Sequence, residues 1–436
     1  MTGYLAVPAA LAGDISVVVG PRLLAGVADA PGLSAHRRRW GECPTLGAQQ
    51  LVDLTRDGQV AGRGGAGFPF SRKLATAISA NKKRTMVVNA AEGEPGSAKD
   101  STLLLTVPHL VLDGATVVAR ALDVASVHLI IPGERPAIRP AIEAAIAEHD
   151  GGIEFLLVET SAGFVGGQAR AVLELVSGRE NLPVTAWEPE AVSGLRGRPT
   201  LLSNAETYAQ VAALCMLGAR EYGRLGTRDE PGTALLTVGG DGVTGVVLEV
   251  PYGTPMREVL SRCGYDLEAP VVIGGYHGTW MTPQMVADRL VSRADLKAAG
   301  TSLGAGVILP VRRDACPVEL TAQVVVYLAG QTARRCGPCF NGLPALAEAC
   351  VALADGSAGQ SVLSRIEQLI GLLPGRGACT HPDGTVRLVR SLLRAYPEEV
   401  AMHLVGPCAH QSVPASFAPP EPSSAASRAE QGMVSL

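Results

Sequence analysis

Hydrophobic and polar positions along the middle of the chain switch between two periods. Short apolar runs predict strands at residues 85–89, 127–131 and 153–158. Between them, apolar residues recur at helical spacing and predict helices at residues 108–121 and 136–147. Because strands that alternate with helices usually pair in parallel, this part of the chain predicts an α/β domain with a parallel sheet.

The pattern then changes twice. Short strands with glycine-rich turns predict a small α+β module at residues 231–317. Apolar residues at spacings of three and four predict a helical bundle at residues 318–408. These two units follow the α/β domain, whose predicted bounds are residues 51–230. Residues 1–50 are predicted to be an irregular leader, and residues 409–436, rich in Pro, Ser and Ala, a disordered tail.

Composition narrows the class of protein. The 436 residues are 47% hydrophobic and 18% charged, which is typical of a compact folded chain. The net charge is −4 and the basic residues are scattered, whereas a nucleic-acid-binding face needs clustered positive charge, so no nucleic-acid partner is expected. No run approaches the about 20 apolar residues that span a bilayer, and no signal peptide is recognisable. The sequence therefore predicts a cytoplasmic protein without direct membrane insertion.

Nine cysteines, an odd number, and the missing signal peptide argue against a disulfide framework. Cys336 and Cys339 form a C-x₂-C pair at the start of a predicted helix, and Cys379 follows after 39 intervening residues. A helix N-terminus favours thiolates. These three cysteines are therefore candidate metal or redox ligands.

A glycine run follows a predicted helix at residues 51–57. Gly62, Gly64, Gly65 and Gly67 let backbone N–H groups approach a phosphate or an aromatic ring closely. Lys73, six residues further on, can pair with a phosphate. The run matches neither the Walker nor the dinucleotide spacing, so a turn that serves only the backbone remains the alternative.

An acidic loop follows the strand predicted at residues 85–89. It contains Asn89, Glu92 and Glu94, and the ends of parallel strands are where open α/β sheets bind ligands. The two carboxylates can accept hydrogen bonds from ribose or from ring N–H groups. Taken alone, the loop fits a solvated acidic turn equally well.

Four segments together share the order and spacing of one family: GRGGAGFP from residue 62, NAAEGEPG from residue 89, AVSGL from residue 191 and NAET from residue 204. On these motifs the chain resembles the NADH-oxidising flavoprotein subunit of complex I and the related subunits of NAD-linked hydrogenases and formate dehydrogenases. The resemblance covers about residues 50–405. It implies that the α+β module is a β-grasp-like (SLBB-type) domain and that the helical bundle binds an iron–sulfur cluster.

The resemblance also implies which residues bind cofactors. It places FMN in the glycine run and the acidic loop, with NADH beside Phe68 and close to Glu94. The cofactor-binding candidates carried over by position are Gly62, Gly64, Gly65, Gly67, Phe68, Lys73, Asn89, Glu92, Glu94 and Asn204.

Several positions depart from the family pattern on the nucleotide side of this site. Ala91 stands where the family has an acidic residue, and Gln168 and Ala169 stand where it has two glutamates. Pro189 replaces an aromatic residue that stacks on the nucleotide, with Trp187 as a possible substitute. Each lost polar contact costs about 1–3 kcal/mol, so binding of NADH is expected to suffer more than binding of FMN.

In the family, C-x₂-C-x₂-C plus one distant cysteine hold a [4Fe–4S] cluster. Here the first position is Ala333, so Cys336, Cys339 and Cys379 remain. A cluster with a non-cysteine or open fourth position is one interpretation. The alternatives are a relic that has lost the cluster, a zinc site completed by His381, and a thioredoxin-like dithiol pair.

These expectations describe an electron-transfer subunit. Electrons would pass from NADH or another donor through FMN to an iron–sulfur centre, and the partners would be other redox subunits such as a ferredoxin-like protein. The alternative is a non-catalytic scaffold subunit that has lost part of its cofactor sites.

Overall fold

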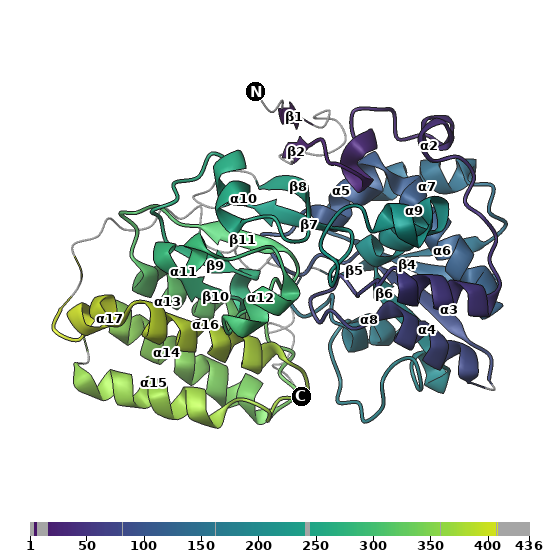
Figure 1. Ribbon diagram of the computed structural model, residues 1–436. Coiled ribbons are helices and arrows are strands. Elements are labelled where there is room, and N and C mark those ends of the chain that lie inside the picture. Colours follow the sequence, from purple (N-terminus) through teal and green to yellow (C-terminus); the bar gives the residue numbers. More distant parts are fainter. Residues whose placement is uncertain are drawn as a thin grey trace, which may run out of the picture.

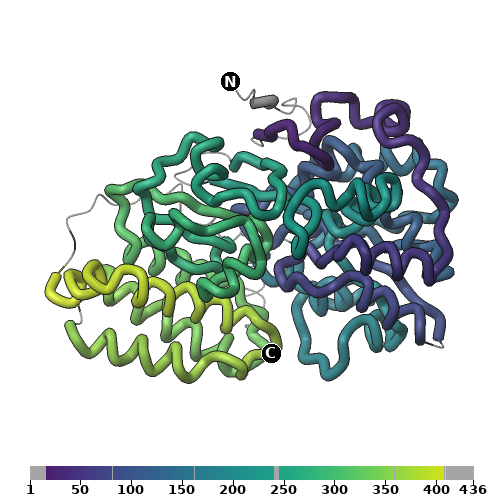
Figure 2. Tube along the Cα trace, viewed as in Figure 1, coloured from purple at the N-terminus to yellow at the C-terminus, as the bar shows by residue number. Residues whose placement is uncertain are grey.

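The computed structural model describes residues 4–6, 16–80, 82–161, 163–239, 245–357, 359–406 and 408. They form two lobes that lie side by side (Figure 1). One lobe contains a four-stranded sheet, and the other contains a seven-stranded sheet with the last helices beneath it. The Cα trace in Figure 2 passes from the purple and blue lobe into the green and yellow lobe. The tail predicted at residues 409–436 lies outside the described residues.

The four-stranded sheet is parallel throughout. Its strand order is β5 (Glu154–Thr160), β4 (Ser126–Pro132), β3 (Thr85–Asn89) and β6 (Thr200–Asn204). The three strands expected from the apolar runs are β3, β4 and β5, and the prediction of an α/β fold with a parallel sheet is confirmed.

Both faces of this sheet are buried. Met86 and Val88 on β3 pack into the largest core, whereas Val87 between them packs into a small core with α8 (Ala169–Val176). Side chains alternate between the faces of a strand, so a strand covered on both sides needs a continuous apolar run. That requirement explains why β3 carries no alternating polar residue at its centre.

Helices cover the large-core face. They are α3 (Ala48–Asp57), α4 (Phe70–Ser79), α5 (Lys99–Thr106), α6 (Pro108–Leu122), α7 (Ile138–Glu148) and α9 (Ala205–Tyr222). The helices α6 and α9 approach each other very closely at Gly114, where a Cβ would overlap the carbonyl oxygen of Tyr208. Glycine is required there because no side chain fits between the two backbones.

The seven-stranded sheet is mixed. Its order is β1 (Tyr4–Ala6), β2 (Ser16–Val18), β8 (Val246–Pro251), β7 (Thr233–Val238), β11 (Val307–Pro310), β9 (Val271–Ile273) and β10 (Thr279–Met281). On one face, Leu236 and Val238 pack with α10 (Met256–Arg262). On the other face, Leu235 joins the core of the first lobe and Val307 joins that of the last helices. This sheet therefore packs against both neighbouring parts of the protein.

Shorter helical segments complete the two sheet regions. They are η1 (Leu23–Gly26), η2 (Leu195–Gly197), η3 (Gly275–His277), α11 (Pro283–Ala287) and α12 (Arg293–Ala298).

The remaining helices lie beneath the mixed sheet (Figure 1). They are α13 (Pro317–Gly330), the π-helical turn η4 (Pro338–Gly342), α14 (Leu343–Ala354), α15 (Gln360–Leu372), α16 (His381–Ala395) and α17 (Pro397–His403). On α14 the buried residues include Leu343, Leu346, Cys350 and Leu353, at the spacing of one helix face. Helices therefore occupy the region where the apolar spacing predicts them.

The part of the predicted leader that the structure describes is ordered, in contrast to the expectation. The helix α2 (Leu33–Trp40) forms there, and Val17 of β2 is fully buried beside β8. Leu23 and Leu24 are also fully buried in the large core. A three-residue strand carries too little periodicity to be recognised, and its order comes from contacts with distant residues.

Among the described residues, no single helix has both the length and the apolar character needed to cross a membrane; α5 and α6 would qualify by length and composition only as a pair, and this pair is bent by 95°.

A cluster of histidines joins α2 to α6. His36 Nε2 lies 2.9 Å from Asp113 Oδ2, and the His109 ring lies 5.6 Å from the His36 ring and stacks on His149 at 6.0 Å. Burial and the neighbouring imidazoles lower the pKa of His109 to about 4. His109 is therefore neutral in the folded protein at neutral pH.

This lowered pKa makes stability depend on pH. The unfolded chain takes up a proton on His109 near pH 6.5, whereas the folded protein does so only near pH 4, so stability is lost as the pH falls through this window. We expect the free energy of unfolding to drop by about 1–2 kcal/mol more between pH 7 and pH 5 in the native protein than in His109→Gln. Urea titrations at the two pH values measure this difference, and equal drops in both proteins would contradict it.

Candidate functional site

A cavity of about 540 Å³ lies at the carboxyl ends of β3 and β6. Ligands of open α/β sheets bind at such edges, and the volume lies in the range of small-molecule sites. The first lobe contributes the glycine run and the loop after β3, and the second contributes His277, Ala305 and Thr380. The cavity is therefore built between the two lobes.

The glycine run forms one wall. Gly62, Gly64 and Gly67 line the large cavity, whereas Gly65 lines a neighbouring cavity of about 170 Å³. The loop is closed at its base by a hydrogen bond of 2.8 Å from the Gly62 N–H to the Phe68 carbonyl. Gly65 and Gly67 have φ values of 108° and 63°, a conformation that other residues rarely adopt. The run is therefore a tight turn that separates two cavities.

Two further candidates flank this wall. Lys73 lines the cavity, and its Nζ donates a hydrogen bond of 2.9 Å to the Leu202 carbonyl. Burial lowers the pKa of Lys73. Phe68 also lines the cavity, and 50% of its surface remains exposed. Lys73 thus supplies a partly buried cation and Phe68 an accessible aromatic ring.

Asn89 and Asn204 meet because β3 and β6 pair in parallel with these two residues in register. Asn204 Nδ2 donates to the Asn89 carbonyl at 3.1 Å, and Asn89 Nδ2 donates to the Gly167 carbonyl at 2.9 Å. Asn89 Oδ1 accepts from the Ala91 N–H at 3.1 Å. The Asn89 side chain therefore holds the walls of the cavity together.

A buried cation supports the same edge. Lys99 is 2% exposed, and its Nζ lies 2.9 Å from Asp100, 2.8 Å from Asn204 Oδ1 and 3.2 Å from Glu206. Burial alone would lower the pKa of Lys99, but the two carboxylates hold it above its ordinary value. Lys99 is therefore charged and joins α5 to β6 and α9.

Glu92 lines the cavity, but its carboxylate is occupied by the protein itself. It accepts hydrogen bonds from both the N–H and the hydroxyl of Ser101, from the Asp100 N–H at 2.9 Å and from the Ser97 hydroxyl at 2.9 Å. Arg135 forms an ion pair with it at 3.1 Å. Burial alone would raise the pKa of Glu92, yet these partners hold it below its ordinary value. Glu92 therefore fixes the shape of the loop.

The pKa of Glu94 is shifted in the opposite direction from that of Glu92. Its Oε1 accepts a hydrogen bond of 3.1 Å from the Tyr276 N–H. Loss of water raises the pKa of Glu94 to about 8 in spite of this bond. At neutral pH, Glu94 is therefore a protonated acid that can donate a hydrogen bond into the cavity.

The residues that depart from the family pattern also lie at the cavity. The cavity is lined by Ala91, Gln168 and Ala169, so the positions at which this chain lacks the carboxylates of the family pattern belong to the site itself. Trp187 is 93% exposed and is not among the lining residues, so the structure places it outside the cavity wall. Glu190, which the motifs do not single out, is a lining residue.

The three candidate ligands Cys336, Cys339 and Cys379 lie together. Cys336 Sγ and Cys339 Sγ are 3.4 Å apart, and Cys379 is close enough to contribute to the raised pKa of Cys339, which burial chiefly causes. Ala333 is 7% exposed. His381 is not available as a fourth ligand, because its Nε2 faces the Leu328 carbonyl at 2.8 Å and its Nδ1 faces His277 Nε2 at 3.1 Å. The zinc interpretation of this trio is therefore disfavoured.

The cavity and the cysteine trio touch. The Gln168 side chain lines the cavity and lies close enough to the Cys379 thiol to affect its pKa, and Thr380, the residue after Cys379, is also a lining residue. The rings of Phe164, His277 and His381 pack at centroid separations of 4.5 to 5.5 Å beside this junction. A ligand in the cavity is therefore one side chain away from a cysteine sulfur.

Comparisons with known proteins agree with this arrangement. The family model described as the Nuo51 FMN-binding domain matches residues 55–213, and the model of the NADH-ubiquinone oxidoreductase-F iron-sulfur binding region matches residues 319–403. The chain is a divergent member of this flavoprotein family. Most residues that line the cavity lie in the first of these matched parts, and the cysteine trio lies in the second.

Individual relatives of the flavoprotein are similar over most of their length. In Rhizobium meliloti, the F 2 subunit of NADH-quinone oxidoreductase is 27% identical over 391 residues, covering 86% of this chain and 92% of the relative. The corresponding F subunit of Escherichia coli is 29% identical over 376 residues, covering 81% and 84%. A crystal structure of an NAD⁺-reducing [NiFe]-hydrogenase in the air-oxidized state superposes with a TM-score of 0.80 at 25% identity, covering 92% of this chain and 72% of the hydrogenase chain.

Several residues of the flavoprotein site are not recognisable from local sequence. Phe164 and His277 reach the cavity from separate segments, and His277 comes from the other lobe. No sequence motif contains both residues, so their meeting at the cavity is not predictable from the sequence. Lys99 follows the acidic motif after two intervening residues, and the Lys99-Asp100 pair at the start of a helix was the signal available for it.

The buried cation at Lys99 gives a stability prediction. Lys99→Met would leave Asp100 without its cation and Glu206 with only Arg63, whose Nε lies 3.8 Å away, and breaking a buried ion pair on one side costs about 3–5 kcal/mol. Lys73→Met should cost much less, because Lys73 bonds one carbonyl. Chemical denaturation of the two variants measures the difference. Equal losses would mean that the Lys99 network does not hold this edge.

The neutral Glu94 gives a second prediction. Its folded pKa of about 8 lies above its ordinary value of 4.5, so the native protein loses stability as the pH rises through this window. Glu94→Gln keeps the acceptor oxygen and removes the titration. Its stability relative to the native protein should therefore increase by about 3–4 kcal/mol between pH 5 and pH 8.5.

Glu92→Gln is the matched control for Glu94→Gln. Since the pKa of Glu92 is lowered, that variant should be destabilised at neutral pH. Thermal unfolding across the pH range separates the two, and a shift of the same sign in both would contradict the assignment of Glu94 as the neutral acid.

Proposed function

We propose that the chain is an electron-transfer subunit that takes electrons from NADH or another donor at bound FMN and passes them to an iron–sulfur centre. One observation carries this proposal. Gln168, which lies beside the Cys379 thiol, and Thr380, which follows Cys379 in the chain, both line the cavity, so the two candidate cofactor sites share a wall. Bound FMN accepts an electron pair and an iron–sulfur centre carries single electrons, and the shared wall leaves little distance between them.

The cavity fits FMN. A Cβ at Gly64 would meet the Asn204 Cβ at 3.7 Å, so ordinary packing does not require glycine there. Glycine instead keeps the backbone open toward the cavity, as close approach of a flat ring or a phosphate needs. Lys73 supplies a cation at the wall for the phosphate. Gly62, Gly64, Gly67, Asn89 and Asn204 would hold the remainder of the molecule. Gly65 would act by shaping the turn.

The cysteine trio fits three of the four thiolate positions of a [4Fe–4S] cluster. Cys336, Cys339 and Cys379 would bind three irons. Ala333 supplies no ligand for the fourth, which leaves that position open to a non-cysteine group. An iron without a protein thiolate is more accessible to small ligands, and cluster potential depends on such differences.

The side of the cavity where the electron donor would bind departs most from the family pattern. Ala91, Gln168 and Ala169 remove carboxylates that the family pattern contains, while Phe68 remains exposed beside the cavity. Glu94 in its protonated form would offer a hydrogen bond to the donor. These features support a donor site that binds NADH weakly or accepts a different reductant.

The proposed units are a flavin-binding domain at residues 51–230, a β-grasp-like domain at residues 231–317 and a cluster-binding domain at residues 318–408. Separate hydrophobic cores around the mixed sheet and the last helices support this division. The relatives are named as subunits, which supports a redox partner subunit such as a ferredoxin-like protein.

The visible spectrum of the full chain purified without oxygen tests the function. We expect flavin bands over a broad iron–sulfur absorption, with about one extractable FMN per chain, and bleaching by NADH or by a reduced ferredoxin. Cys336→Ser should lose the iron and keep the FMN, because the cysteine lies outside the cavity lining.

Cys263→Ser is the control, since Cys263 ends α10 in a different core. It should keep both cofactors. A colourless native protein, or FMN and iron that no donor reduces, would overturn the electron-transfer proposal and favour the scaffold.

A further inference from the structure

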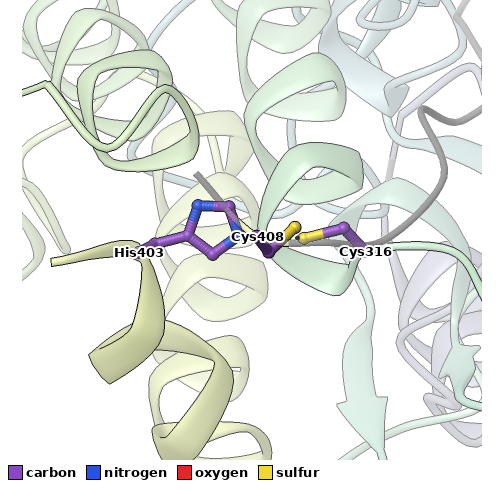
Figure 3. A group of neighbouring side chains, drawn as sticks. All are labelled: Cys316, His403 and Cys408. Atoms are coloured by element: carbon purple, nitrogen blue, oxygen red, sulfur yellow. Dashed lines mark hydrogen bonds between the residues drawn. The ribbon is translucent and has the colours of Figure 1, made fainter. Parts of the chain in front are cut away.

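Two cysteines and a histidine meet at a place that the proposed function does not use. Cys316 precedes α13, His403 ends α17, and Cys408 follows five residues later (Figure 3). Their ligand atoms all lie within 4.8 Å of one another, and Cys316 Sγ is 3.2 Å from His403 Nε2. We refer to these three residues as the Cys₂His trio. Within the described part of the chain, it is the one group of three such side chains found this close.

The Cys₂His trio is separate from the cluster cysteines. Cys316 lies at the start of α13, whereas Ala333 lies three residues beyond its end at Gly330. A helix of 14 residues is about 21 Å long. The two groups of cysteines therefore occupy opposite ends of one helix.

The histidine is held in the tautomer that binds metals. His403 Nδ1 lies 2.8 Å from the Ala354 carbonyl, which has no proton to give, so Nδ1 carries the hydrogen and donates it. The lone pair on Nε2 then faces Cys316 Sγ. A backbone carbonyl that fixes the second nitrogen in this way is the usual companion of a metal-binding histidine. His403 and Cys316 are 1% and 0% exposed, so water does not compete for either group.

A carboxylate near the trio is the candidate for a fourth metal ligand. Glu319 Oε1 lies 4.0 Å from Cys408 Sγ, and the Glu319 N–H donates to Cys316 Sγ at 3.5 Å. The start of α13 also favours negative charge on Cys316. Zinc bonds of about 2.3 Å to sulfur and about 2.0 Å to nitrogen place sulfur and nitrogen about 3.5 Å apart in a tetrahedron. The observed 3.2 Å needs only a small adjustment.

We propose that Cys316, His403 and Cys408 bind a structural Zn²⁺ ion, and that the nearby Glu319 side chain turns toward them to supply the fourth ligand. Two thiolates and an imidazole favour zinc over magnesium or calcium. The ion ties the start of α13 to the chain beyond α17, and so closes a loop that contains every helix of the C-terminal region. Closing a long loop in this way stabilises the folded state by restricting the unfolded chain.

Metal analysis of the full chain, purified without chelators, tests the site. We expect about one zinc per chain in addition to any iron. Cys316→Ser and Cys408→Ser should each lose the zinc and retain FMN and iron. Cys350→Ser is the matched control, because Cys350 is a buried free cysteine on α14 outside the trio, and it should keep the zinc.

Cys336→Ser separates this proposal from the proposed function. It should lose iron and keep zinc, so a failure of the iron–sulfur assignment leaves the zinc result unaffected. If the trio variants do not fold, Co²⁺ loaded into the native protein in place of zinc should give the absorption of a thiolate-bound tetrahedral ion.

Three results would overturn the zinc site. They are a native protein without zinc, zinc that persists in Cys316→Ser, and a Cys316–Cys408 disulfide found by alkylation and peptide mapping of the protein as isolated. The last would show that the two sulfurs pair with each other and that His403 only accepts a hydrogen bond from the reduced Cys316 thiol.

Discussion

The buried ammonium of Lys99 is the constraint on which the cavity depends. A charge removed from water must be paired, and three groups from β6, α5 and α9 converge on it: Asn204, Asp100 and Glu206. Their convergence fixes the edge of the parallel sheet where β3 and β6 end side by side. The glycine run and the acidic loop lie next to that edge and line the same cavity. The shape of the cavity is therefore determined by an ion-pair network whose members Lys99, Asp100 and Asn204 line the cavity themselves.

The second lobe completes what the parallel sheet begins. The mixed sheet has its own core on one face, and its other face contacts both the first lobe and the C-terminal helices. Through this arrangement His277 reaches the cavity and packs against Phe164 from the first lobe and His381 from α16. Burial lowers the pKa of both histidines, so the aromatic junction is neutral and apolar. An uncharged, tightly packed junction is suited to excluding water between two redox sites.

Local sequence patterns were sufficient to predict three strands of the parallel sheet. The strands β3, β4 and β5 follow from their apolar runs. Nine of the ten cofactor candidates, which the family resemblance supplied, line the large cavity. Gly65 does not, because its backbone turns toward the smaller cavity. The order of residues 16–50, the exposure of Trp187 and the contribution of His277 depend on contacts between distant segments. The Cys₂His trio was invisible for the same reason, since Cys316 and His403 come from opposite ends of the helical region.

The glycine run is the common wall of two cavities, and this geometry has a thermodynamic consequence. Tyr252 and Arg293 line only the smaller cavity, whereas Gly62, Arg63 and Gly67 belong to both. Any ligand that shifts the shared backbone on one side changes the free energy of binding on the other. Linkage requires this coupling to be reciprocal. A ligand that moved this shared wall from the smaller cavity would therefore change binding in the larger one, and the reverse effect would have the same coupling energy.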